Sequence, residues 1–198
     1  MTAGYVPKSP SGWNSESGAD EGASSFVFLK PGEWILAAGP TRVKTILGSC
    51  VAITVRSARL GLAAVTHCLL PTAGEAGESL DDETAPRYVD SALSIVFDTF
   101  AQRGALPMEL EVKLVGGADG LTLDLWRSRY SVGARNVRTA LREIASRGIT
   151  PAASVVGGRS GRVLVFDTAT GDLFVKRLSI AAVNNRRAET NGEIDGLE

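Results

Sequence analysis

Runs of apolar residues, broken by turn residues, predict that most of this chain forms short β-strands. Residues 26–38, 43–57 and 60–71 are rich in Val, Ile and Leu, and Pro71 ends the third run. Three later segments, 110–120, 151–158 and 161–179, have the same character. The last of them contains the turn sequence DTATGD at 167–172, which predicts a hairpin.

Two segments instead show helical spacing. The first covers about 88–100, with Thr84 as its expected cap, Pro86 in its first turn and Gly104 at its end. Its predicted inward face consists of Val89, Leu93, Val96, Phe97 and Phe100. The second covers about 134–146 and stops at Gly148. Its predicted inward face consists of Val137, Leu141, Ile144 and Ala145.

Many strands and two principal helices in irregular alternation predict an α+β fold, with sheets in the core and helices covering them. Residues 1–25 are dominated by Ser, Gly, Pro and charged residues, so we expect a disordered N-terminal arm. Residues 183–198 have a similar composition and predict a flexible tail. The folded domain is therefore expected at about 26–182.

Composition narrows the classes of function. The 198 residues carry a formal net charge of -1, which gives no field that would attract nucleic acid or an anionic membrane. No apolar stretch is long enough to span a bilayer, and the N-terminus lacks the features of a secretory signal. We therefore expect a cytoplasmic protein, and the two cysteines are expected to be free thiols.

The chain uses histidine once, at His67, in the apolar segment that follows the one containing Cys50. If the two segments pair as neighbouring strands, thiol and imidazole come within hydrogen-bond range. The alternative is that Cys50 is an ordinary buried cysteine and His67 a hydrogen-bonded filler of the core. Cys68 fits this structural role better than Cys50, because no small residues precede it.

A cysteine beside a histidine can form a thiolate–imidazolium pair that attacks a carbonyl carbon. The same histidine can then protonate a departing amide nitrogen. Gly48 and Ser49 lie directly before Cys50, where their backbone N–H groups could stabilise the developing oxyanion. The pattern favours cleavage of an amide or ester through a thioester. This chemistry requires no metal or other cofactor.

Five blocks in order resemble the CheD family, the chemoreceptor glutamine deamidases of bacterial and archaeal chemotaxis. They are LGSCVA (47–52), H-x-L-L-P (67–71), KLVGGA (113–118), VGARN (132–136) and the stretch from GGRSGR through the hairpin to VKR (157–177). The resemblance implies a mixed β-sandwich with flanking helices and a cysteine hydrolase site. It also implies deamidation of glutamines in methyl-accepting chemotaxis receptors, with Cys50 as nucleophile and His67 as base, and it suggests a CheC-type phosphatase as a further partner.

Two positions depart from the family's pattern. The family's third catalytic residue is a threonine six positions before the cysteine, where this chain has Lys44, so Thr45 is the provisional candidate. One step along a strand turns a side chain to the opposite face, so Thr45 fits only if the local backbone is irregular or the pattern is shifted. The family also tends to carry an acid where this chain has Val155.

These departures leave alternatives open. One is a non-catalytic module that binds receptors or the phosphatase, and another is hydrolysis of receptor methyl esters, which uses the same thiol chemistry.

Nucleotide binding is not expected. The glycine pairs Gly116–Gly117 and Gly157–Gly158 lack the lysine and spacing of a phosphate cradle and suit tight turns or close contact with a substrate. Arg135 and Asn136 are expected simply to begin the second helix.

Overall fold

The computed structural model describes residues 25–74, 81, 84–119 and 131–178. The predicted N-terminal arm and C-terminal tail lie outside these ranges, apart from Ser25, which begins the first strand. The described residues form two β-sheets and two α-helices, in agreement with the α+β expectation.

Sheet A has four strands in the order β1-β3-β8-β9. Their bounds are Ser25–Phe28, Thr41–Leu47, Arg162–Asp167 and Leu173–Arg177. Sheet B has five strands in the order β2-β5-β4-β6-β7. Their bounds are Trp34–Ala37, Leu62–Cys68, Val51–Ser57, Leu110–Gly116 and Ala153–Val156. The pairs β1–β3 and β6–β7 are parallel and the remaining pairs antiparallel, so both sheets are mixed.

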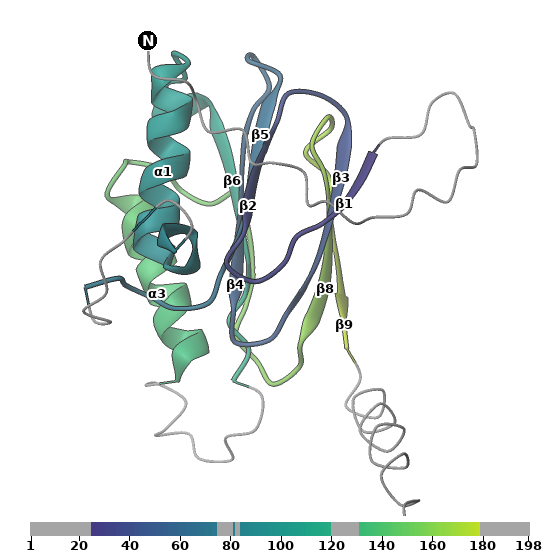
Figure 1. The fold of residues 1–198 in the computed structure, drawn as a ribbon, viewed down its shortest axis with the longest axis vertical. Helices are drawn as coiled ribbons and strands as arrows, with labels where there is room; N and C mark the ends of the chain where they lie inside the picture. Colours follow the sequence, from purple (N-terminus) through teal and green to yellow (C-terminus); the bar gives the residue numbers. More distant parts are fainter. Residues whose placement is uncertain (1–24, 75–80, 82–83, 120–130, 179–198) are drawn as a thin grey trace, which may run out of the picture.

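The molecule has three layers: sheet A, sheet B, and the helices α1 (Val89–Gln102) and α3 (Val132–Ala145) on the outer face of sheet B (Figure 1). One core cluster joins the two sheets and includes Val43, Leu47, Val65 and Leu164. The other lies between sheet B and the helices and includes Ile53, Leu93, Phe100 and Leu114. Short 3-10 turns at Ala85–Arg87 and Pro107–Glu109 complete the described elements.

This layering explains the two hydrophobic patterns of the strands. Strand β4 lies in the middle layer and is buried on both faces, so nearly every residue from Val51 to Val55 is apolar. Strand β8 alternates between fully and partly buried positions, because the described residues cover sheet A on one face only. The hairpin predicted around residues 167–172 is the β8–β9 connection.

The structure divides two segments that the sequence pattern suggested were continuous. Residues 26–38 form β1 and β2, and residues 43–57 form β3 and β4, which belong to different sheets. Gly48, Ser49 and Cys50 make the crossing between the sheets. The apolar composition continues across the crossing because both flanking strands are buried, so it gave no sign of the break.

The apolar face predicted for the first helix is confirmed, since Val89, Leu93, Val96, Phe97 and Phe100 are all buried. The predicted cap was wrong. Tyr88 is the N-cap of α1, whereas Thr84 precedes the short 3-10 turn and its hydroxyl bonds to Asp81 instead.

The inward face predicted for the second helix was partly wrong. Leu141 and Ala145 are exposed, and the buried face of α3 consists of Gly133, Asn136, Thr139, Ala140 and Ile144. Small and polar residues occupy this face because α3 approaches the backbone closely. A Cβ on Gly133 would lie 2.8 Å from the carbonyl carbon of Gly117.

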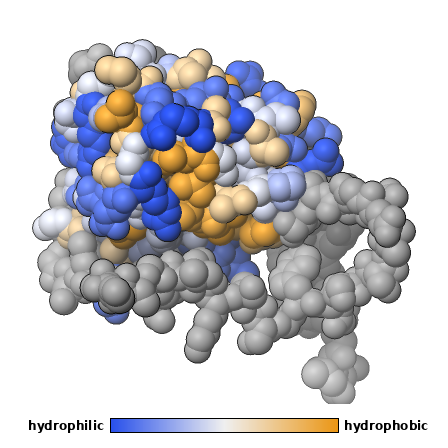
Figure 2. All heavy atoms as spheres, turned by 90° about the horizontal axis from the view of Figure 1, so that it is seen from above, coloured by the Kyte–Doolittle hydropathy of each residue, from blue (hydrophilic) through white to orange (hydrophobic). Residues whose placement is uncertain are grey.

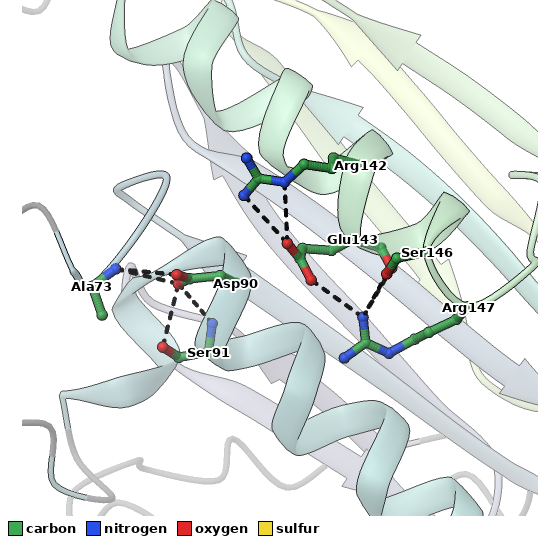
Figure 3. Close-up of polar contacts among 7 residues, drawn as sticks. All are labelled: Ala73, Asp90, Ser91, Arg142, Glu143, Ser146 and Arg147. Carbon is green, nitrogen blue, oxygen red and sulfur yellow. Dashed lines mark hydrogen bonds and ion pairs between the residues drawn. The ribbon is translucent and has the colours of Figure 1, made fainter.

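Polar contacts fix both helices (Figure 3). The Asp90 carboxylate, at the start of α1, accepts from the backbone N–H of Ala73 and so anchors the segment that follows β5. Glu143 on α3 pairs with Arg142 and with Arg147, which lies two residues after the end of the helix. The Arg147 guanidinium lies 4.8 Å from the centre of the Phe97 ring, which links the two helices by a cation–π contact.

Strand β9 ends at the lower end of the sandwich in Figure 1, where β3, β5, β6 and β7 also end. The opposite end, seen from above in Figure 2, shows a strip of apolar residues between hydrophilic ones. Within the described ranges, no helix is long and apolar enough to cross a membrane.

Candidate active site

Thr45 lies on β3 with its side chain directed into the space between the sheets. Val43, Thr45 and Leu47 are buried, whereas Lys44 and Ile46, on the opposite face of the strand, are partly or fully exposed. The strand is regular through these positions, so Thr45 rather than Lys44 faces sheet B. The candidate threonine is therefore one position nearer to Cys50 than in the family's pattern, and its side chain still faces the space between the sheets.

The Thr45 hydroxyl makes two short contacts. Its Oγ1 atom lies 2.7 Å from His67 Nδ1 and 2.8 Å from the carbonyl oxygen of Leu29. A carbonyl can only accept, so the single hydroxyl proton is donated to Leu29. The hydroxyl oxygen then accepts from Nδ1–H of the imidazole. We infer that neutral His67 carries its proton on Nδ1 and its lone pair on Nε2.

His67 is the second-last residue of β5, and backbone hydrogen bonds hold it in place. Its backbone N–H donates to Glu33, and its carbonyl accepts from Gly32. The side chain is only 1% exposed, and Nε2 is buried without a hydrogen-bond partner among the described residues. A buried polar atom without a partner is rare in a folded protein and is characteristic of a functional site. The atom suited to act as a base is thus the one left without a partner.

Cys50 lies at the crossing between the sheets and is half-buried, next to exposed Gly48 and Ser49. In the β4–β5 ladder, Ala52 is opposite His67. Cys50 is two residues before Ala52 on the same face, so it is the diagonal neighbour of His67. The prediction that the two segments pair is confirmed. Cys68, by contrast, is fully buried, and burial raises the pKa of its thiol to about 12.

The pKa shifts of Cys50 and His67 bear on the thiolate–imidazolium pair expected from the sequence. Burial raises the pKa of the Cys50 thiol, and a hydrogen bond from its own backbone N–H offsets this only in part. Burial lowers the pKa of His67, opposed in part by the backbone carbonyl of Leu29 and by the charge of Glu33. Both directions favour a neutral thiol beside a neutral imidazole over a preformed thiolate–imidazolium pair. Proton transfer from sulfur to Nε2 would then accompany the attack on the substrate.

The backbone carbonyl groups of all three residues of the crossing accept hydrogen bonds. Gly48 accepts from the Ala118 N–H, Ser49 from the Asn136 side chain and Cys50 from the Gly117 N–H, at 2.8, 3.0 and 2.8 Å. Within the described part of the chain, the N–H groups of Gly48 and Ser49 donate no hydrogen bond. They are therefore available to an oxyanion beside Cys50.

Asn136 is the residue of this site that the sequence analysis did not recognise. Its side chain is fully buried on α3, and its amide nitrogen donates to Ser49 at 3.0 Å and to Leu69 at 2.9 Å. Ser49 is next to Cys50, and Leu69 is two residues after His67. One amide therefore ties together the two segments that carry the thiol and the imidazole. The only sign of this role in the sequence is that Asn136, in the VGARN block, is a polar residue within a predicted helix.

Gly116 and Gly117 shape the floor of the site. Their φ angles are 118° and 65°, and a Cβ on Gly116 would lie only 2.3 Å from the Cys50 carbonyl oxygen. A side chain here would displace the segment that carries the thiol. The sequence predicted tight turns or contact with a substrate for this glycine pair, and the structure places Gly116 against the backbone of Cys50. No cluster of three or more metal-ligating side chains occurs among the described residues.

Fold and site together describe an α+β sandwich with cysteine, histidine and threonine at one end, between its two sheets. A family model described as CheD chemotactic sensory transduction matches residues 69–177. A relative from Geobacter sulfurreducens, named probable chemoreceptor glutamine deamidase CheD 2, is 44% identical over 153 residues, which cover 77% of this chain and 90% of the relative. The chain belongs to the CheD family.

The similarity extends to archaea. A probable chemoreceptor glutamine deamidase CheD from Natronomonas pharaonis is 31% identical over 160 residues, which cover 80% of this chain and 92% of the relative. Among solved structures, the Bacillus licheniformis hypothetical protein YfiH is similar with a TM-score of 0.39 and 12% identity, over 62% of this chain and 49% of that one.

Proposed function

We propose that this protein is a protein-glutamine deamidase that converts glutamines of methyl-accepting chemotaxis receptors to glutamate. The relatives described above are named for this activity. The observation that carries the proposal for this chain is the arrangement at His67, whose Nδ1 is fixed by Thr45 while Nε2 has no partner among the described residues. His67 is opposite Ala52 in the β4–β5 ladder, and Cys50 is two residues before Ala52.

In the proposed reaction, His67 Nε2 takes the thiol proton as Cys50 Sγ attacks the carboxamide carbon of the glutamine. The C=O electrons move to oxygen, and the N–H groups of Gly48 and Ser49 stabilise the resulting charge. The imidazolium returns its proton to the amide nitrogen, and ammonia leaves. A thioester between Cys50 and the receptor remains.

Hydrolysis of the thioester uses the same residues in reverse order. His67 takes a proton from water, the hydroxide attacks the thioester carbon, and the sulfur leaves and recovers the proton. The products are glutamate and the free thiol. Thr45 acts in both halves by holding the imidazole in the Nδ1–H tautomer and in a fixed orientation, so we assign it the role of a positioning residue.

The substrate glutamines belong to the cytoplasmic helices of receptors, so we propose a cytoplasmic location for the protein. A CheC-type phosphatase is the second proposed partner. The chemistry needs neither a metal nor an organic cofactor, because thiol, imidazole and backbone N–H groups supply all proton transfers and charge stabilisation.

The experiment is to incubate a receptor cytoplasmic fragment with the protein and to measure ammonia release, with a methylated fragment assayed in parallel for methanol. Ammonia release from the amide form supports the deamidase. Methanol release alone would identify a methylesterase, and binding of the fragment without either product would identify a non-catalytic module.

A further inference from the structure

A second cluster of chemistry-bearing side chains lies at the same end of the sandwich. A pocket at the ends of β7 and β9 and the start of β8 is lined by Arg159, Arg162 and Arg177, together with Ser160 and the Gly157–Gly158 turn. We call these residues the arginine pocket. None of the residues that line it is acidic.

Arg162 forms the base of the arginine pocket. The residue is only 3% exposed, and its guanidinium donates to the backbone carbonyls of Gly116 and Gly157. Its Nε–H has no partner among the described residues, and none of their ion pairs includes Arg162. Carbonyl groups satisfy donors without neutralising the charge, so this nearly buried cation has no counterion among the described residues.

Arg177 increases this unbalanced charge. It is directly opposite Arg162 in the β8–β9 ladder, and like charges in that position repel each other. Burial and the charge of Arg177 both lower the pKa of the Arg162 guanidinium. Arg159 and Arg177 are themselves exposed, so they can turn toward a ligand that enters from solvent. An anion between these groups would relieve the repulsion and supply the missing acceptor.

The arginine pocket is connected to the candidate active site through Gly116. Arg162 donates to the Gly116 carbonyl, and the next residue, Gly117, donates to the Cys50 carbonyl. On the other sheet, Arg162 is opposite Leu47, three residues before Cys50. A protein segment that presents a side chain to Cys50 therefore passes close to the arginine pocket.

We propose that the arginine pocket binds a carboxylate side chain of the protein substrate near the glutamine that Cys50 attacks. This inference rests on the proposed deamidase function and adds a determinant of substrate choice. Guanidinium groups suit a carboxylate because they can present two parallel N–H donors to its two oxygens. Glutamines with an acidic neighbour at the matching distance would be converted in preference to others.

The test uses the substitutions Arg159→Gln and Arg177→Gln, each of which removes an exposed charge without touching a buried carbonyl contact. Lys176→Gln is the matched control, because it makes the same change one residue along β9, on the opposite face of the strand. Thermal unfolding should show all three variants folded at the assay temperature, with Arg177→Gln at least as stable as Lys176→Gln because the repulsion of Arg162 is removed. The substrates are a receptor fragment with mapped target glutamines and a version in which nearby acidic residues are replaced by alanine. Glutamine is avoided as the replacement because it would add new targets.

On the acidic fragment we expect KM to rise about tenfold for Arg177→Gln, and also to rise for Arg159→Gln, because a charge-assisted hydrogen bond is lost. We expect kcat to stay unchanged, and Lys176→Gln to behave as wild type. On the alanine fragment, wild-type KM should rise and Arg177→Gln should add nothing further, which is the signature of a direct pair.

An Arg177→Gln variant with the KM of Lys176→Gln on the acidic fragment would overturn the proposal. So would inhibition of wild type by millimolar phosphate that disappears in Arg177→Gln while KM for the fragment is unchanged, because the pocket would then hold a free anion. Failure of the deamidase function would be seen separately, as a wild-type protein that releases no ammonia. Binding of the two fragments would in that case still test the arginine pocket.

Discussion

Thr45 and His67 come from different sheets and meet through a 2.7 Å contact between Oγ1 and Nδ1. Because the Thr45 proton is engaged by Leu29, this contact fixes the imidazole tautomer and leaves Nε2 as the basic atom. The catalytic proposal depends on the resulting orientation of a single ring, and most of the predictions concern what holds that ring and the thiol in place.

Thr45→Val preserves the shape of the side chain but removes the hydroxyl. We expect kcat to fall by about a hundredfold, because general-base catalysis by a correctly oriented group contributes on that order. Thr45→Ser, which keeps the hydroxyl, should retain most of the activity. Ammonia release from a receptor fragment, measured beside the thermal stability of each variant, checks the prediction. Equal activities of the Val and Ser variants would remove Thr45 from the mechanism.

The pH profile should reflect the buried state of His67. Burial lowers its pKa below the ordinary value of 6.5, so the neutral imidazole persists to lower pH than in an exposed histidine. As pH falls through the lowered pKa, Nε2 becomes protonated and kcat/KM should decline. We therefore expect the acidic limb of the profile below pH 6.5. A limb above that value would mean that a stabilised imidazolium, rather than a neutral base, is the resting form.

The same shift predicts a loss of stability in acid. Between the lowered pKa of folded His67 and 6.5, the unfolded chain binds a proton that the folded chain does not, so the free energy of unfolding decreases as pH falls through this window. Denaturant titrations of wild type and His67→Gln check this, because the variant should lack this part of the pH dependence. Parallel curves for the two proteins would contradict it.

Asn136→Asp removes both amide donors and places a carboxylate against the carbonyls of Ser49 and Leu69. We expect a loss of about 1–3 kcal/mol in the free energy of unfolding for each carbonyl left without its partner. We also expect a marked fall in kcat, because the thiol and the imidazole lose their common tether. The control is Ile144→Val, which perturbs the same helix away from the tether and should cost about 1 kcal/mol with little effect on kcat. If both variants lost kcat in proportion to stability, Asn136 would be purely structural.

Gly116→Ala should disrupt the site, because its Cβ would lie 2.3 Å from the Cys50 carbonyl oxygen. Gly61→Ala is the matched control: its φ is 60°, and no atom lies within 4 Å of the added Cβ, so it introduces only backbone strain of about 1–2 kcal/mol. We expect the first variant to lose activity and the second to keep wild-type kcat. The comparison uses ammonia release at a temperature where both proteins are folded, and wild-type kcat in Gly116→Ala would be evidence against the close packing at Cys50.

Local periodicity was sufficient to predict several elements from the sequence. The face of α1 and the β8–β9 hairpin depend on spacing within a few residues, and both agree with the structure. The pairing of β4, which follows Cys50, with β5, which carries His67, could also be anticipated, because adjacent strands commonly pair. These features are encoded by residues that are near one another in the chain.

Other features depend on contacts between distant segments and could not be predicted in this way. The crossing at Gly48–Cys50 joins two buried strands and is invisible in an apolar pattern. Asn136 acts through carbonyls 87 and 67 residues away, so its role follows only from the packing of α3. The arginine pocket likewise forms because β8 and β9 bring Arg162 and Arg177 to opposite positions.

The most direct test of the account is mass spectrometry of a receptor fragment incubated with wild type, Cys50→Ala or Cys68→Ala. Each deamidated glutamine gains about one dalton when the thiol route operates. We predict this gain with wild type and with Cys68→Ala, whose cysteine is buried and inert, and none with Cys50→Ala. Conversion by Cys50→Ala at the wild-type rate would contradict the proposal that Cys50 is the nucleophile.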